Sequence, residues 1–228
     1  MESVGIDYFI LVHFTESVAQ MSPTLFIDTF LTPLQIDTLV VGFDFRFGHK
    51  GAGQIEDLKK HTHVEVIDEI KYDNKKMGSE LVRDYLESGQ IRHVTNILGR
   101  YYNITGKVIT GNQVGRKIGI RTANLLIDED YHFLKKGVYA VFVKIDQKSY
   151  FGACNIGNNP SINYTEKPRL EVHILDFNET IYEKEISVDF VHFLREEFYY
   201  EDKEKLINQI KQDIIDVRTI LTKEDKNI

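Results

Sequence analysis

Six short runs rich in β-branched and aromatic residues follow residue 100, and they limit what the second half of this chain can fold into. Turn-forming residues lie between the runs, as expected for consecutive strands of an all-β domain. Strands of this number and spacing can close into a barrel, which removes the exposed edges of an open sheet. We therefore predict a six-stranded β-barrel from the segments Asn103–Ile109, Thr122–Ile127, Val138–Ile145, Ser149–Ile156, Leu170–Leu175 and Ile186–Phe190.

The segment Lys203–Leu221 has helical periodicity and follows the last predicted strand. Its apolar residues recur at steps of three and four, which gathers them on one face of a helix. Such a stripe is more often a packing surface than a ligand site, so we expect this helix to lie against the barrel. The stripe consists of Leu206, Ile210, Ile214, Val217 and Leu221.

Strands alternate with helices before residue 100, which predicts an α/β layer with a parallel sheet. The apolar run Tyr8–Val12 fits a core strand of such a sheet. Ser22 followed by proline predicts a helix that reaches Leu31. Where this pattern gives way to strands we set a domain boundary, between residues 99 and 100. The other expected elements are the strands Thr38–Phe43 and Val64–Ile67 and the helices Ile55–Lys60, Ser79–Glu87 and Ile91–Leu98.

Charge and cysteine content exclude several classes of protein. The formal net charge of −7 argues against nucleic acid or an anionic membrane as a main partner. Cys154 is the only cysteine, so an intrachain disulfide and a zinc site of four cysteines are impossible. It lies in an apolar run, which predicts a buried thiol rather than a nucleophile. No apolar run has the length of a membrane span and the N-terminus has no basic segment before its apolar run, so we expect a cytoplasmic protein of unknown oligomeric state.

A glycine-rich stretch between residues 106 and 119 has the character of a phosphate-binding loop. Glycine lets the backbone come close to a ligand, and here Gly111 and Gly115 are followed by Arg116. The stretch matches neither G-x-x-x-x-G-K-[ST] nor G-x-G-x-x-G, which excludes the common phosphate loops. An ordinary β-hairpin with a glycine-rich turn is the alternative account.

Thr122 and Asn124 follow this loop with one residue between them. In an extended strand, residues i and i+2 point to the same face. Uncharged oxygen ligands of this kind suit a magnesium ion that keeps its waters and takes its other ligands from substrate phosphates. Loop and strand together therefore suggest a site for a nucleotide and a metal ion.

The sequence G-R-K-I-G-I-R-T-A-N-L, which contains this pair, resembles the riboflavin kinase signature G-R-x-L-G-F-P-T-A-N-L. Three further stretches agree in order and spacing: G-V-Y-A-V at Gly137–Val141, N-I-G-N-N-P-S at Asn155–Ser161 and R-L-E-V-H-I-L-D-F at Arg169–Phe177. The stretch Val40–Gly48 resembles the adenylyltransferase half of bacterial bifunctional riboflavin kinase/FAD synthetases. One departure is Arg121, which stands where the family has proline.

The resemblance implies phosphoryl transfer from MgATP to riboflavin, with FMN as product. Glu171 matches the family's catalytic glutamate and would deprotonate the terminal hydroxyl of the ribityl chain. Without the resemblance, a carboxylate on a barrel strand is more often solvated. Arg195 and Glu197 match a family stretch near the flavin ring, although a charged helix entry explains them equally well. We expect His173 to serve as polar packing on the face of Glu171.

The α/β half lacks the family's G-x-F-D-x-x-H-x-G-H motif, whose histidines hold ATP phosphates. None of the eight histidines forms H-x-G-H, and Met1 lies downstream of the expected position. A later motif, S-S-x-x-I-R in the family, is G-S-E-L-V-R here and keeps Ser79 and Arg83. Asp44 and Arg46 follow a strand where α/β sheets bind ligands, but a surface ion pair is the better account from sequence. We therefore interpret this half as a structural or regulatory remnant.

Together these features predict a truncated Rossmann-like nucleotidyltransferase layer (residues 1–99), then a riboflavin kinase β-barrel with a C-terminal helix (residues 100–228). The predicted function is that of a riboflavin kinase that uses Mg²⁺, with riboflavin and ATP as its small-molecule partners. Two alternatives stay open: a bifunctional enzyme with residual FMN adenylyltransferase activity, and a flavin-binding regulatory protein without catalysis.

Overall fold

The computed structural model describes residues 5–111, 120–127, 131–132, 134–157, 169–198, 200 and 202–225. The chain divides into two compact units, Met1–Lys76 and Met77–Ile228. The boundary predicted between residues 99 and 100 separates two functional domains. A division of the chain into compact units does not test that boundary, so it stays a prediction. No helix among the described residues has the length and hydropathy needed to cross a membrane.

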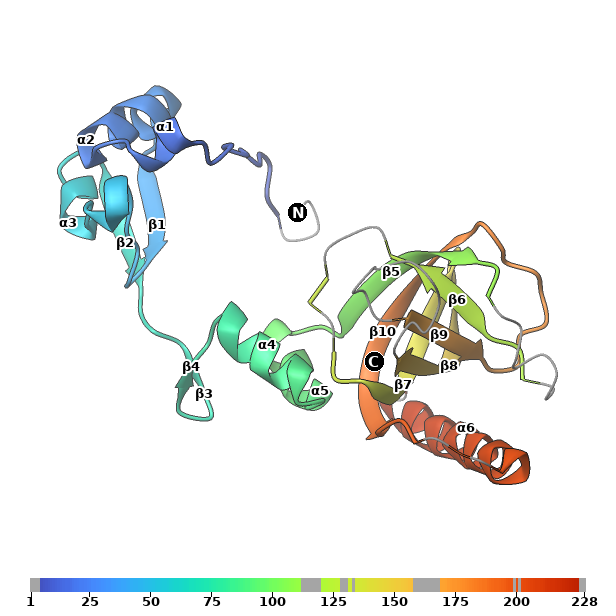
Figure 1. Cartoon of the computed structure of the whole chain (residues 1–228). Coiled ribbons are helices and arrows are strands. Elements are labelled where there is room, and N and C mark those ends of the chain that lie inside the picture. The colour runs from blue at the N-terminus through green and yellow to red at the C-terminus, as the bar shows by residue number, and fades with distance from the viewer. Residues whose placement is uncertain are drawn as a thin grey trace. The chain divides into compact units, whose positions relative to one another are not determined.

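The first unit contains a two-stranded parallel sheet of β1 (Thr38–Gly42) and β2 (His63–Ile67), shown in Figure 1. The Ser22 hydroxyl accepts a hydrogen bond from the Leu25 amide at 3.2 Å, so it caps a helix as expected. That helix begins as α2 and continues as a wider π-type turn through Leu31, which confirms the predicted range. The α-helices described in this unit are α1 (Glu16–Ala19), α2 (Pro23–Phe26) and α3 (Ile55–Leu58), with short 3-10 turns at Thr32–Leu34 and His49–Gly51. Strands β3 (Lys71–Tyr72) and β4 (Lys75–Lys76) form a short hairpin.

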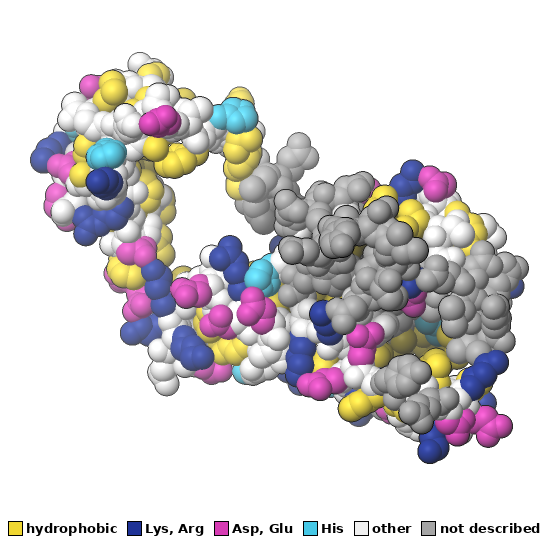
Figure 2. Space-filling view, in the orientation of Figure 1, with side chains coloured by type: hydrophobic (Ala, Val, Ile, Leu, Met, Phe, Trp, Pro, Cys, Tyr) yellow, Lys and Arg dark blue, Asp and Glu magenta, His cyan; other side chains and the backbone are white. Residues whose placement is uncertain are grey.

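The strand predicted at Tyr8–Val12 is wrong, because this segment has no regular secondary structure and lies exposed. Tyr8 is 89% and Leu11 is 72% exposed. Hydrophobic side chains therefore line the N-terminal segment in Figure 2. An extended segment becomes a strand by pairing with a neighbour, and among the described residues β1 pairs only with β2. The small core of the unit forms elsewhere, from Ile27, Val41, Phe47, Leu58 and Val64.

The second unit is built around a closed barrel of strand order β10-β5-β6-β9-β8-β7 (Figure 1), which confirms the predicted six-stranded barrel. All neighbouring strands are antiparallel. The strands are β5 (Tyr102–Ile109), β6 (Ala123–Leu126), β7 (Gly137–Ile145), β8 (Lys148–Gly157), β9 (Arg169–Ile174) and β10 (Glu185–Arg195). Their bounds differ from the predicted ones mainly at β10, which is longer.

Alternation along β9 shows which face of the barrel is inside. Its buried residues are Leu170, Val172 and Ile174, and its partly exposed residues are Arg169, Glu171 and His173. Since side chains of a strand alternate between faces, the polar set lies on the outer face of the barrel.

Among the described residues, two helices pack on the barrel strands and a third packs on one of these helices. Helix α6 (Lys203–Asp225) lies against β7, β8 and β10, where Val217 and Leu221 are fully buried, as the apolar stripe predicted. Helix α5 (Ile91–Leu98) packs on β5 and β10 and against α4 (Ser79–Glu87). The predicted ranges of α4 and α5 are confirmed.

Candidate functional site

Asn124, Glu171 and Asn155 form one row across three adjacent barrel strands. The register pairs Glu171 on β9 with Asn124 on β6 and with Asn155 on β8. Asn124 is buried at 6% exposure, and the Glu171 side chain is 27% exposed. The predicted metal ligand and the predicted base are thus direct cross-strand neighbours, which places their β-carbons about 4.5–5.5 Å apart in an antiparallel pair.

Arg169 binds both of these residues through its guanidinium. Its Nε and Nη2 donate to Asn124 Oδ1 at 2.8 and 2.5 Å, and Nη2 also forms an ion pair with Glu171 Oε1. Arg169 lies two residues before Glu171 on the same face of β9, so the strand geometry brings its guanidinium within reach of the Glu171 carboxylate. The amide oxygen of Asn124 and the carboxylate of Glu171 therefore share one cation.

Gly111 lies against the Asn124 side chain. A β-carbon at Gly111 would overlap the Asn124 amide, so only glycine leaves room for this close approach. The structure thus brings Gly111 and Asn124 together, as expected if the glycine-rich loop and the strand form one site. Gly115 and Arg116 lie outside the described residues, and their role stays a prediction.

Thr122 lies one residue before β6, and the segment leading to it is held by His173. The His173 Nδ1–H donates to the backbone carbonyl of Arg121 at 2.7 Å. The Arg121 guanidinium donates to the carbonyl of Asn178 at 3.5 Å. One hydrogen bond to its backbone and one from its side chain therefore hold Arg121, which stands where the family has a proline. This gives His173 a definite contact that the sequence did not predict.

A cavity of about 150 Å³ opens beside Thr122. It lies between the start of β6, the buried face of β9 and the loop that follows β9. Its wall combines apolar side chains with the hydroxyl of Thr180 and the carboxylate of Glu179, a mixture typical of small-molecule sites. The lining includes Arg121, Thr122, Ile174, Phe177, Thr180 and Tyr182.

The oxygen donors fit a magnesium ion. Thr122 and Asn124 offer uncharged oxygens, and the Asn124 oxygen already binds a cation, the guanidinium of Arg169. Among the described residues no group of three or more His, Cys, Asp or Glu side chains could hold a metal. A donor set of two neutral oxygens fits an ion that takes its remaining ligands from water and phosphates, as Mg²⁺ does.

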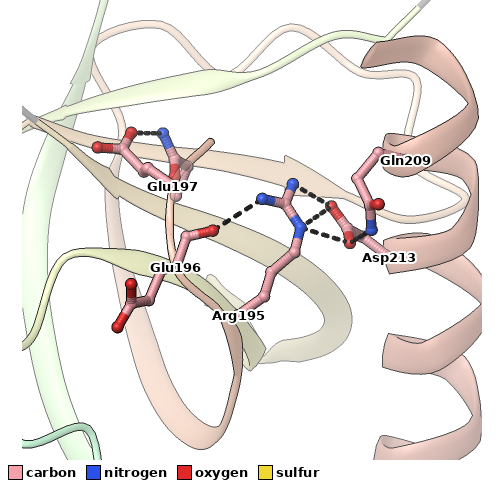
Figure 3. A network of polar contacts seen from close by, with 6 residues as sticks. Arg195, Glu196, Glu197, Gln209 and Asp213 are labelled. Carbon is pink, nitrogen blue, oxygen red and sulfur yellow. Dashed lines mark hydrogen bonds and ion pairs between the residues drawn. The ribbon is translucent and has the colours of Figure 1, made fainter. Parts of the chain in front are cut away.

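Arg195 is anchored to helix α6 by a buried ion pair with Asp213 (Figure 3). The fork is bidentate, with Nε to Oδ1 at 2.9 Å and Nη2 to Oδ2 at 2.7 Å. Gln209 donates to the same carboxylate at 2.9 Å, and Arg195 Nη1 donates to the Glu196 carbonyl at 2.9 Å. The hydrogen bonds to Asp213 raise the pKa of the Arg195 guanidinium. The Arg195 guanidinium is therefore committed to contacts within the protein.

Glu197 reaches the row of Asn124, Glu171 and Asn155 through Asn155. The Asn155 amide donates to Glu197 Oε1 at 2.8 Å. A β-carbon at Gly157 would overlap the Glu197 carboxylate, which explains the glycine two residues after Asn155. The two predicted flavin-binding residues thus differ, because Glu197 joins the row of Asn124 and Glu171 whereas Arg195 faces α6.

Sequence reasoning missed Arg169, Asn155 and Asp213 as members of the site. Arg169 had a signal, since it lies two residues before Glu171 and hence on its face. Asp213 also had one, because it lies in phase with the apolar stripe of α6, three residues after Ile210 and four before Val217. Asn155 had none, because its partner Glu197 is distant in sequence.

The remaining residues outside the barrel site are accounted for more simply. Asp44 forms an exposed ion pair with Lys76, whose ammonium lowers the pKa of the carboxyl by hydrogen bonding. Ser79 and Arg83 line an apolar pocket of about 510 Å³ at α4 and α5. Cys154 is fully buried, and burial raises the pKa of its thiol, as expected for a structural cysteine.

Comparison with known proteins agrees with this geometry. The family model for riboflavin kinase matches residues 98–221, and the model for FAD synthetase matches residues 1–81. A bifunctional riboflavin kinase/FMN adenylyltransferase of Listeria monocytogenes is 34% identical over 98% of this chain and 72% of its own length. One of Buchnera aphidicola is 38% identical over 94% of this chain and 71% of its own length.

Among solved structures, a macrolide-efflux protein from Streptococcus pneumoniae matches with a TM-score of 0.89 and 27% identity. The match covers 95% of this chain and 71% of that one. The fold is thus shared nearly throughout. The chain belongs to the bifunctional riboflavin kinase/FMN adenylyltransferase family, and its barrel is the riboflavin kinase domain.

Proposed function

We propose that the barrel transfers the γ-phosphate of ATP to the ribityl 5′-hydroxyl of riboflavin, with Thr122, Asn124 and Glu171 as the central residues. The observation that carries this proposal is the direct cross-strand pairing of Asn124 with Glu171. It puts a neutral oxygen ligand beside a carboxylate, so that the phosphoryl group and the hydroxyl can meet between them.

In this proposal Glu171 accepts the proton of the ribityl hydroxyl, and the hydroxyl oxygen attacks the γ-phosphorus. The bond from the γ-phosphorus to the bridging oxygen breaks, and ADP carries away that electron pair. Thr122 and Asn124 would hold Mg²⁺, which would neutralise the charge on the phosphates. Gly111 and the predicted loop residues Gly115 and Arg116 would hold the phosphates in line.

The flavin would lie on the side of the row where Asn155 holds Glu197. Glu197 is exposed and connected to Glu171 through Asn155, so it could contact the flavin directly. Arg195 would act by fixing the end of β10 on α6, which sets the position of the two residues that follow it. An enzyme that consumes ATP and a soluble vitamin would work in the cytoplasm.

A flavin-binding protein without catalysis is a weaker account, because binding alone does not require a carboxylate paired with a metal ligand. The test is incubation of the purified chain with riboflavin and MgATP, followed by chromatographic separation of flavins. FMN as the sole new product supports the proposal. FMN together with FAD would support a bifunctional enzyme, and no new flavin from a folded, riboflavin-binding protein would support the binder.

A further inference from the structure

Arg169 binds the same oxygen that the proposed metal site requires. Two of its nitrogens donate to Asn124 Oδ1, and one of them also pairs with the Glu171 carboxylate. Two N–H groups of one charged guanidinium thus converge on a single amide oxygen. A metal ion that binds this oxygen must compete with the two hydrogen bonds from Arg169.

Electrostatics oppose the metal as well. A guanidinium keeps its charge at all working pH values, and it lies within hydrogen-bond distance of the proposed ligand. A divalent cation at Asn124 would therefore be repelled by Arg169 at short range, in a site that is largely shielded from water. Both effects, competition for the oxygen and repulsion, weaken binding of the free metal ion.

Nucleotide phosphates would relieve both effects. They bring negative charge, and a guanidinium forms strong, often bidentate hydrogen bonds with phosphate oxygens. Arg169 would then have a new partner when it gives up Asn124. The phosphates would also supply ligands to the metal, as Mg²⁺ sites commonly require.

We propose that Arg169 is a built-in competitor of the metal ion: it occupies Asn124 and Glu171 in the free protein and yields Asn124 only when the metal arrives with nucleotide. The site would thereby bind the metal–nucleotide complex and discriminate against free metal. This inference rests on the proposed kinase site. It assigns Arg169 a role in positioning and selectivity, apart from the chemical step.

A structural role is the competing account, since Arg169 also ties β9 to the short strand β6. The two accounts differ in what removal of the fork does to metal affinity. Loss of a competitor raises the affinity for free metal. Loss of a contact that only orients Asn124 lowers both the affinity for free metal and the stability of the fold.

The experiment measures Mn²⁺ binding to the 228-residue chain by electron paramagnetic resonance, with and without ADP. The variants are Arg169→Met, which keeps an unbranched stem without charge, and Arg169→Lys, which keeps the charge without the fork. Arg92→Met is the matched control, because Arg92 forms an exposed ion pair with Glu224 at 2.8 Å, away from the site. Thermal melting shows whether each variant is folded.

We expect Arg169→Met to bind Mn²⁺ without nucleotide about tenfold more tightly than the unchanged chain, since a charge-assisted hydrogen bond and a repulsive charge are both removed. Arg169→Lys should show a smaller gain, and Arg92→Met none. With ADP present, the difference between Arg169→Met and the unchanged chain should shrink.

Equal or weaker Mn²⁺ binding by folded Arg169→Met would overturn the inference while leaving the kinase proposal intact. If Arg169→Met fails to fold, equal or weaker Mn²⁺ binding by folded Arg169→Lys would overturn the inference instead. Failure of every protein to bind Mn²⁺ even with ADP would instead overturn the metal site itself, and with it both proposals.

Discussion

Asn124 and Glu171 face each other across the β6–β9 pair, and the guanidinium of Arg169 connects them. Their separation is set by the register of two backbone strands, so neither residue depends on a mobile loop for its position. Rigid placement of this kind favours catalysis, because small errors in the distance between reacting groups cost rate. The predictions below follow from this pair and from the contacts around it.

Replacing both proposed metal ligands, Thr122→Ala with Asn124→Ala, should lower kinase turnover on the order of 10²-fold or more, because a metal ion contributes several kcal/mol of charge stabilisation. The measurement is FMN formation under saturating riboflavin and MgATP. The matched control is Asn103→Ala with Thr105→Ala, the same residue types at the same spacing on β5. Turnover close to that of the unchanged chain in the folded double variant would exclude these ligands.

Glu171→Gln keeps the size and hydrogen-bonding capacity of the side chain but removes the proton acceptor. We expect a loss in kcat of about 10²-fold, with riboflavin and MgATP still bound, since general-base catalysis contributes about 10²–10⁴-fold. Glu185→Gln, an exposed position at the start of β10, serves as the control. A loss of less than about threefold would show that Glu171 is no general base.

The chain should not convert FMN to FAD, because none of its eight histidines forms the H-x-G-H motif. The measurement is incubation of FMN with MgATP and separation of the flavins, with the Listeria monocytogenes relative as positive control. Steady FAD formation that depends on this chain would show that the motif is dispensable for adenylyl transfer.

Asp213→Ala should destabilise the barrel unit by about 3 kcal/mol, because it leaves the largely buried guanidinium of Arg195 without its partner. Urea unfolding measures the change in the free energy of unfolding. Asp176→Ala removes the exposed partner of Arg218, another ion pair to α6, and should cost far less, because solvent screens an exposed pair. Equal effects in the two variants would mean that burial of the Arg195 pair has no energetic consequence.

The thiol of Cys154 should not react with an aromatic disulfide reagent at pH 8 in the native protein. Burial keeps the reagent out and raises the pKa of the thiol, so the reactive thiolate is scarce. One thiol per chain should react after unfolding in guanidinium. Rapid reaction of the folded protein would reveal an opening of the barrel between β7 and β9.

The sequence contained most of the information for the barrel and for the central pair. Adjacent residues in a strand point apart, so the sequence alone was enough to expect His173 on the face of Glu171, and the alternating burial along β9 agrees. The same logic predicted the stripe of α6. These patterns are local, so they can be read without knowing the fold.

Contacts between distant segments could not be read in this way. The Asn155–Glu197 and Arg195–Asp213 pairs depend on strand register and on how α6 packs. The segment Tyr8–Val12 shows the opposite failure, since an apolar composition suited to a strand does not supply the neighbour with which a strand must pair. Pairing partners, rather than propensity, decided these cases.

The strand that carries Asn124 is also the shortest of the barrel, with four residues, whereas β8 has ten. Short ladders open more readily than long ones, so the backbone amides of β6 should exchange with deuterated solvent before those of β7 and β8. Substrates that bridge Asn124 and Glu171 would then stabilise the pairing of β6 with β9, and their binding would slow hydrogen exchange along β6. Ligand binding and stable pairing of β6 with β9 would thus be coupled.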